Sequence, residues 1–538
     1  MKLVFSGAAH EVTGSCHYIN ACGKNIILDC GMEQGRDIYE NQEIPVAVTD
    51  LDYVFLSHAH IDHSGYLPLI YKNGFKGKIF TTEATADLCT IMLRDSAHIQ
   101  EFEAEWRNRK AKRSLEKPLE PLYTVADAEG VLQLFQPCSY EERINVCEGI
   151  DIQFTDIGHL LGSSSIKIWL SEDGITKTLV FSGDIGNIDQ PLIEDPKYTD
   201  EADYVIMEST YGNRYHGEKP DYYTELAHYI QDTFDAGGNL VIPAFAVGRT
   251  QELLYFIRKI KEDKIIKGHE GFKVYVDSPL AIEATKVFNE NTVSFYDDEA
   301  LELIRKGINP ISFEGLQTSV SSDDSKAINF DKEPKVIISA SGMCEAGRIR
   351  HHLKHNLWRE ESTILFVGYQ AYGTLGRTLI EGAESVKLFG EKIGVNAKIA
   401  QLNGISGHAD KQGLLNWING FKVKPKRVFV VHGDDTVTDE FADCLVKEYG
   451  YDAFAPYSGA EFDMLTNTII SKGVRKLVEQ KETEVSKGAA RGSALYKELE
   501  AASSRLKTII ANNKGSANSD LEKLISRVNE LCDELDKK

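Results

Sequence analysis

The stretch LSHAHIDHSG, residues 56–65, constrains the fold of this chain more than any other segment. It follows the apolar run DYVFL and holds three of the chain's 15 histidines and one aspartate within six residues. Successive side chains of an extended segment alternate in direction, so His58 and His60 should point the same way, and a turn then directs Asp62 and His63 elsewhere. The pattern predicts one pair of ligands for each of two metal ions. A hydrogen-bonded turn is the weaker alternative, because chance gives H-x-H-x-D-H in roughly one chain in a thousand.

Short apolar runs that end in a polar residue recur in the first part of the chain. Examples are NIILDCG, DYVFLSH, IDIQFTDIGH, TLVFSGDIG and DYVIMEST. Such runs are typical of buried sheets whose strand ends line a site. From Tyr211 to about Gly390 the strand and helix patterns alternate, which predicts a parallel α/β region. After it, RVFVVHGDD is again an apolar run that ends in polar residues.

Length and composition limit the class of protein. A chain of 538 residues with 42% hydrophobic residues predicts two or three folded domains. The formal charge of −22 repels bulk nucleic acid, so a polyanionic substrate would need a local basic path. Nine cysteines without a C-x-x-C pair indicate reduced thiols. Because no signal peptide or membrane-spanning run is recognisable, we expect a cytoplasmic protein with no membrane partner.

Three further motifs accompany the histidine run, one before it and two after it. Asp29 stands in ILDCG, His159 in DIGHLLGSSS and Asp184 in FSGDIG. With the histidine run, this set resembles the metallo-β-lactamase fold superfamily. The resemblance implies two Zn²⁺ per chain, and it implies that Asp29 holds the histidine turn in place. The implied ligands are His58, His60 and His159 for one zinc and Asp62 and His63 for the other, with Asp184 bridging.

A large insertion after MESTYG resembles the β-CASP branch of that superfamily, which processes nucleic acids. Glu208 in DYVIMES, His408 in ISGHAD and His432 in VFVVHGD match its additional motifs. The insertion itself is similar to that of bacterial and archaeal relatives of the pre-mRNA 3′-end-processing endonuclease. The implied fold is α/β: an αββα metallo-β-lactamase sandwich split by a parallel α/β β-CASP domain, with a C-terminal helical tail. We expect the sandwich at 1–208 and 391–470, the insertion at 209–390 and the tail at 471–538.

The resemblance implies a zinc-dependent ribonuclease that hydrolyses phosphodiester bonds. His408 would donate a proton to the leaving oxygen, Glu208 would orient His408, and Asp62 belongs to the same catalytic set. His432 would complete the second zinc shell, as in RNA-processing members. A DNA nuclease of the same family, another metallo-hydrolase and an inactive subunit stay open as alternatives. The sequence does not decide between endonuclease and 5′-to-3′ exonuclease action.

The acidic net charge directs attention to local basic groups that could bind single-stranded RNA. Glycine-flanked arginines stand in GRTQ, EAGRIRHHLKH and TLGR. For Arg350 and Lys354 a solvated helix face is an equal alternative, and RNRKAKR, residues 107–113, is expected to be an exposed helix face. The predicted substrate-binding residues are Arg249, Ser341, Arg348, Arg377 and Ser406.

The last segment differs in kind from the rest. Leu495, Leu499, Ala502, Leu506 and Ile509 keep a three–four spacing, and so do apolar residues from 521 to 535. The spacing predicts two helices joined by a turn, with a capping box formed by Ser519 and Glu522. We expect these helices to form a homodimer, with packing on the body of the same chain as an equal alternative.

Overall fold

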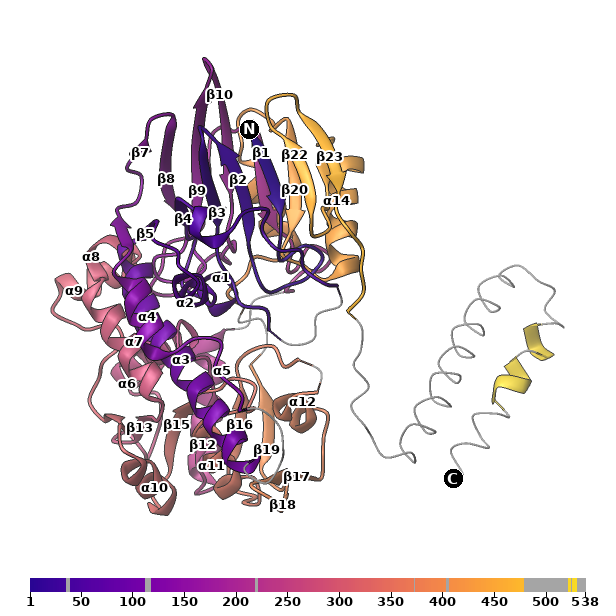
Figure 1. Cartoon of the computed structure of the whole chain (residues 1–538). Coiled ribbons are helices and arrows are strands. Elements are labelled where there is room, and N and C mark those ends of the chain that lie inside the picture. Colours follow the sequence, from indigo (N-terminus) through magenta and orange to yellow (C-terminus); the bar gives the residue numbers. More distant parts are fainter. Residues whose placement is uncertain are drawn as a thin grey trace. The chain divides into compact units, whose positions relative to one another are not determined.

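The computed structural model describes residues 1–34, 39–111, 118–217, 221–371, 373–402, 406–478, 521–523 and 525–529. The chain separates into two units, Met1–Leu477 and Val478–Lys538 (Figure 1). In the second unit residues 521–523 and 525–529 are helical, which fits the second predicted tail helix. The first predicted tail helix and Ser519 of the expected capping box lie outside the described residues.

The first sheet of the larger unit has eight strands, and both ends of that unit contribute to it. Strand β1 pairs with β2 on one side and with β22, from the end of the unit, on the other. In spatial order the strands are β23 (Thr468–Lys472), β22 (Ala460–Asp463), β1 (Lys2–Phe5), β2 (His17–Ala21), β3 (Lys24–Leu28), β4 (Tyr53–Phe55), β5 (Lys78–Thr82) and β6 (Phe135–Cys138).

A second sheet of seven strands packs against the first (Figure 1). Its order is β21 (Ala453–Phe454), β20 (Arg427–Val431), β11 (Tyr204–Glu208), β10 (Ile175–Phe181), β9 (Ser164–Glu172), β8 (Ile150–Asp156) and β7 (Ile144–Cys147). Strand β11 pairs in parallel with β20, although the insertion separates them in sequence. The chain therefore returns from the insertion directly beside the strand at which it left.

The core of this sandwich lies between the two sheets. Phe55 from the first sheet and Phe154, Phe181 and Phe429 from the second are buried in one cluster. Alternate residues of β8 and β9 face this layer, which is the pattern of a strand with one covered face. Helices cover the outer faces: α2 (Leu67–Lys72), α3 (Glu83–Ala111) and α4 (Val125–Leu132) on the first sheet, and α13 (Lys411–Asn419) and α14 (Asp435–Lys447) on the second.

The insertion forms a third sheet of six parallel strands. Strands β12 and β15 are buried along their whole length, as expected of central strands with helices on both faces. The order is β14 (Leu316–Thr318), β13 (Lys273–Val276), β15 (Lys335–Ser339), β12 (Leu240–Pro243), β16 (Thr363–Phe366) and β19 (Lys398–Gln401). The fold is thus the expected α/β sandwich with an inserted parallel α/β domain.

One strand of this third sheet comes from beyond the expected end of the insertion at residue 390. Strand β19 pairs in parallel with β16. Only one of the four residues of β19 is buried, because β19 is an edge strand, so its sequence KIAQ carries no apolar run. The other expected domain boundaries stay predictions.

Three smaller predictions concern the basic run after residue 106, the cysteines and membrane-spanning helices. Helix α3 carries Arg107 and Arg109 on an exposed face, each paired with a glutamate one turn earlier. The eight cysteines in the described ranges are free thiols. Among the described helices, none is both long enough and apolar enough to cross a bilayer.

A histidine interrupts the apolar layer between the two sheets. The ring of His17 lies 5.3 Å from the ring of Phe5 and 5.6 Å from that of Phe181, measured between centroids. Neither ring nitrogen has a hydrogen-bond partner among the described residues. Burial, followed by the nearby His432 and His63, lowers the pKa of His17 from 6.5 to about 3.

We predict that His17→Phe reduces the loss of stability in acid. Between about pH 6.5 and pH 3 the unfolded chain binds a proton at His17 and the folded chain does not, so stability falls as the pH falls. From pH 7 to pH 5 the wild type should lose roughly 2 kcal/mol more than the variant. Urea unfolding at the two pH values measures this difference. His228→Phe, at an exposed histidine, is the control, and equal pH dependence of His17→Phe and wild type would contradict the prediction.

Candidate metal centre

The histidine run spans the turn after β4, which carries His58 and His60, and the short helix α1 (Ile61–Ser64), which carries Asp62 and His63. Strand β4 is a central strand of the first sheet, and it ends at Phe55, just before the run begins. The carboxylate of Asp29, directly after β3, accepts hydrogen bonds from the backbone N–H and the hydroxyl of Ser57, at 2.8 and 2.9 Å. The turn is therefore fixed to the neighbouring strand end before any ligand is considered.

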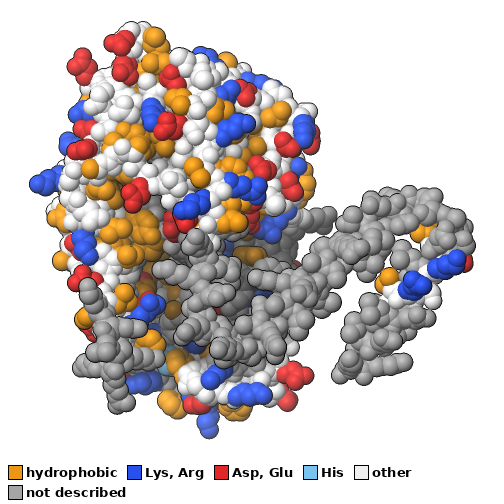
Figure 2. Space-filling view, turned by 45° about the vertical axis from the view of Figure 1, so that its right-hand side comes forward, with side chains coloured by type: hydrophobic (Ala, Val, Ile, Leu, Met, Phe, Trp, Pro, Cys, Tyr) orange, Lys and Arg blue, Asp and Glu red, His pale blue; other side chains and the backbone are white. Residues whose placement is uncertain are grey.

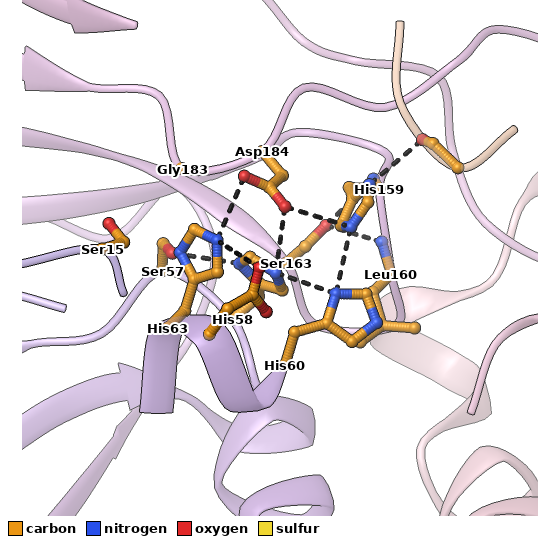
Figure 3. Close-up of polar contacts among 12 residues, drawn as sticks. Ser15, Ser57, His58, His60, His63, His159, Leu160, Ser163, Gly183 and Asp184 are labelled. Carbon is orange, nitrogen blue, oxygen red and sulfur yellow. Dashed lines mark hydrogen bonds and ion pairs between the residues drawn. The ribbon is translucent and has the colours of Figure 1, made fainter. Parts of the chain in front are cut away.

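The first group of metal-binding side chains comprises His58, His60, His159 and Asp184. Their potential ligand atoms lie within 4.8 Å of one another, and Figure 3 shows the rings gathered around Asp184. The Nδ1 atom of His60 lies 3.1 Å from Nε2 of His58 and 3.2 Å from Nε2 of His159. Both of those Nε2 atoms lie 3.5 Å from Oδ2 of Asp184.

The second group comprises Asp62, His63 and His432. The Nε2 atoms of His63 and His432 are 3.1 Å apart. They lie 3.2 and 3.6 Å from Oδ1 of Asp184, the carboxylate oxygen that does not face the first group. Asp184 therefore stands between the two groups, with one oxygen directed at each.

The residues present fit two divalent ions. Three pairs of imidazole nitrogens face each other at hydrogen-bond distance, and lone pairs that converge in this way suit a cation. The Oδ1 atom of Asp184 is buried and has no hydrogen-bond partner among the described residues. Nitrogen and carboxylate donors of this kind are preferred by zinc.

In four of the five ligand rings, all but that of His60, a neighbour holds the outer nitrogen, which leaves the inner nitrogen for the metal. Nδ1 of His63 lies 2.6 Å from Oδ2 of Asp29, so the carboxylate that fixes the turn also fixes this ring. The other contacts are His58 Nδ1 with Ser57 Oγ at 3.1 Å, His159 Nδ1 with the Gly407 carbonyl at 3.1 Å, and His432 Nδ1 with Thr210 Oγ1 at 3.2 Å.

Electrostatics divides the histidines into two kinds. Burial lowers the pKa of His58 and of His159 well below the usual value, so both rings are neutral, as metal ligands must be. Burial also acts on His63, but the carboxylates of Asp184 and Asp29 outweigh it and raise the pKa of His63. Burial alone would raise the pKa of Asp184, yet the surrounding histidines hold it well below its usual value.

A histidine–carboxylate pair adjoins the first group. Nδ1 of His408 lies 3.1 Å from Oε1 of Glu208, and its Nε2 lies 3.9 Å from Oδ2 of Asp184. Glu208 is buried at the end of β11, and it accepts hydrogen bonds from the backbone N–H groups of Ile185 and Thr210, at 2.6 and 3.1 Å. Burial lowers the pKa of His408, but Glu208 and Asp184 outweigh it and raise that pKa to about 10.

The two groups open into a cleft of about 400 Å³ between the sandwich and the insertion. Arg249, at the start of α6 (Arg249–Glu262), lines it beside Glu252, with which Arg249 is paired, and so does Ser406. Arg377 lines an adjoining hollow rather than this cleft. The structure thus brings three of the five predicted substrate-binding residues to these two spaces.

The other two predicted substrate-binding residues are not among the described residues that line the cleft. Arg348 pairs with the buried Asp277 at 2.7 Å and donates to the carbonyls of Ser319 and Val320. Ser341 accepts a hydrogen bond from the backbone N–H of Glu345. Arg350 donates to the Glu345 carbonyl, and Lys354 pairs with Glu391, so both have partners on their own surface.

Sequence reasoning missed the aromatic side chains of the cleft. Tyr211, Phe245 and Tyr369 line it, and about half of the side-chain surface of Phe245 and of Tyr369 is exposed. Their sequence signal was a tyrosine or phenylalanine beside a glycine or proline motif, in STYG, IPAF and GYQ. Such positions usually belong to turns, so sequence alone did not distinguish them.

Three family descriptions match successive parts of the chain. Residues 11–269 match the metallo-beta-lactamase superfamily, residues 250–379 the Beta-Casp domain, and residues 392–456 the Zn-dependent metallo-hydrolase RNA specificity domain. The match to the Beta-Casp domain covers most of the third sheet, and the RNA specificity domain includes His408 and His432.

Several curated proteins are similar over most of their length. Ribonuclease TTHA0252 of Thermus thermophilus is 34% identical over 438 residues, which cover 81% of this chain and 94% of that protein. An RNase J-like protein of Methanocaldococcus jannaschii is 32% identical over 463 residues, which cover 85% and 98%. Transcription termination factor FttA of the same organism is 28% identical over 468 residues, which cover 85% of this chain and 70% of that protein.

The contact between Asp29 and His63 generates a prediction about metal affinity. Asp29→Ala removes the acceptor that orients the His63 ring, so metal should bind about 10- to 100-fold more weakly. Competition with a chromogenic chelator measures the affinity. Asp203→Ala is the matched control, because it removes a strand-end carboxylate that contacts Lys426 and Thr178 but neither group. Equal metal affinity for the Asp29 variant and wild type would contradict this role.

Proposed function

This chain belongs to the β-CASP ribonucleases of the metallo-β-lactamase superfamily, and we propose that it cleaves single-stranded RNA with two zinc ions. Membership makes it a metal-dependent nuclease. The number of ions, the identity of the metal and the mode of cleavage are our proposal. So are the assigned ligands His58, His60, Asp62, His63, His159, Asp184 and His432.

The observation that carries the proposal is the position of Asp184. Its two carboxylate oxygens face the two donor groups separately, at 3.2–3.6 Å from four imidazole nitrogens. One carboxylate between two sets of ligands is the arrangement expected for a pair of ions that act on one phosphate. When bound, two zinc ions would neutralise charge on the phosphate and activate the attacking water.

The chain's own residues supply the proton for the leaving oxygen. His408 directs Nε2 toward the cleft while Glu208 holds Nδ1, so the imidazole has a fixed orientation. As water attacks the phosphorus, the bond to the leaving oxygen breaks, and the Nε2 proton passes to that oxygen. Glu208 balances the charge of the imidazolium and keeps its own geometry through two backbone N–H donors.

RNA is favoured over the alternatives by specific residues. A small-molecule metallo-hydrolase would have no need of the pair formed by His408 and Glu208 or of a cleft closed by an insertion. Nε2 of His432 lies 3.6 Å from Oδ2 of Asp62. A histidine at this position matches the RNA-processing members of the family and supports RNA over DNA as the substrate. On the face drawn in Figure 2, acidic and basic side chains are interspersed, so this face offers RNA no broad basic surface.

The test of this function uses one RNA sequence labelled at either end, together with the same sequence as DNA. We expect zinc-loaded protein to cleave the RNA and to leave the DNA intact. Internal fragments from both labels would indicate endonuclease action, and mononucleotides released from the 5′ end would indicate exonuclease action. Metal analysis of the same sample should give close to two zinc ions per chain. Cleavage of DNA only, or no zinc and no rescue by zinc, would overturn the proposal.

The proton donor has its own prediction. His408→Ala should keep both zinc ions and bind RNA normally, but its single-turnover cleavage rate should fall on the order of a hundredfold. Glu208→Gln should show a smaller fall, because the amide still accepts a hydrogen bond. Zinc content measured beside the rate separates the roles: if His408→Ala loses zinc, His408 is a ligand and the assignment is wrong.

The homodimer and the cytoplasmic location stay predictions.

A further inference from the structure

A second hollow of about 280 Å³ adjoins the metal-site cleft. Tyr211, Gly368, Tyr369 and Ser406 line both spaces, so the two are continuous. The hollow lies beyond the carboxyl ends of β16 and β19, the edge at which parallel α/β sheets bind ligands. Its volume is at the lower end of the ~300–1,000 Å³ range of small-molecule sites, which suits one base with its ribose and excludes a duplex.

The walls of this hollow are aromatic and cationic. The guanidinium of Arg214 lies 4.2 Å from the ring centroid of Tyr211 and 5.9 Å from that of Tyr369. No described carboxylate pairs with Arg214, and no described residue that lines the hollow is acidic, in a chain of net charge −22. About half of the Tyr369 surface is exposed, so part of this residue is open to a ligand.

The segment that carries Tyr211 and Arg214 is tied to the loop of the proton donor. The backbone N–H of Lys411 donates to the Arg214 carbonyl at 3.0 Å. Nε2 of His216 lies 3.0 Å from the His408 carbonyl, and the His216 ring meets the edge of the Tyr211 ring at a centroid distance of 4.8 Å. A ligand held in the hollow is therefore held at a fixed distance from His408.

We infer that this hollow is a base-stacking subsite for the nucleotide that carries the leaving oxygen. The base stacks on Tyr369, and Arg214 contributes a cation beside the base and its phosphate. The assignment to the leaving side follows from the walls: the hollow adjoins the His408 loop and includes neither donor group. Stacking tolerates any base, so the subsite positions the strand without reading its sequence. The inference rests on the proposed function, which it deepens.

The test combines substitutions with a modified RNA. In a short single-stranded RNA, 2-aminopurine replaces each base in turn, because its fluorescence is quenched when it stacks. One position beside the cleaved bond should be quenched on binding to zinc-loaded wild type, and Tyr369→Ala should abolish that quenching. Tyr369→Ala should also raise KM about tenfold with little change in kcat. Tyr369→Phe should behave as wild type, since stacking uses the ring face.

Two controls make the outcomes distinct. Tyr198→Ala removes a tyrosine of similar exposure that lines neither space, and it should leave quenching and KM unchanged. An RNA with an abasic residue at the quenched position should have a raised KM with wild type. With Tyr369→Ala the same RNA should show no further increase in KM. If wild type cleaves RNA but no position is quenched, or if the abasic and Tyr369→Ala effects add, the subsite is overturned. If wild type does not cleave RNA, the proposed function fails, and quenching still tests the subsite alone.

Discussion

The buried carboxylate of Asp184 is the interaction on which the rest of the site depends. It is nearly inaccessible, at 2% exposure, and faces imidazole nitrogens from three separate parts of the chain. An isolated carboxylate so deeply buried would be strongly disfavoured, and here the surrounding histidines hold its pKa low. The ends of four strands, β4, β8, β10 and β20, supply these groups, so the sandwich holds mutually dependent charges in fixed positions.

The parts of the site that sequence could predict are those encoded locally. The residues of H-x-H-x-D-H follow directly after a central strand; alternation predicts that His58 and His60 point the same way, and the turn after them directs His63 elsewhere. Asp29 after β3 and Glu208 at the end of β11 could also be predicted from sequence, because a polar residue after a buried run marks a strand end. Family resemblance was needed to join these positions across 400 residues of chain.

What sequence could not predict depends on tertiary approach. Arg348 stands in a glycine-flanked motif that suggests phosphate binding, but the fold brings the buried Asp277 to it, and an unpaired carboxylate there would be costly. Tyr369 and Arg214 stand far apart in the sequence and come together only in the folded chain. Strand β19 is an edge strand with one buried residue, so its sequence has no apolar run that would predict a strand of the third sheet.

The pairing of β11 with β20 has a consequence for the timing of activity during synthesis. Residues 1–208 contain six of the proposed ligands, yet His408 and His432 arrive only after the whole insertion has been made. On the proposed roles, a ribosome-bound chain that has exposed only its first half carries most of a metal site but neither the proton donor nor the last ligand. The order of the chain therefore delays completion of the proposed site until the whole insertion has been synthesised.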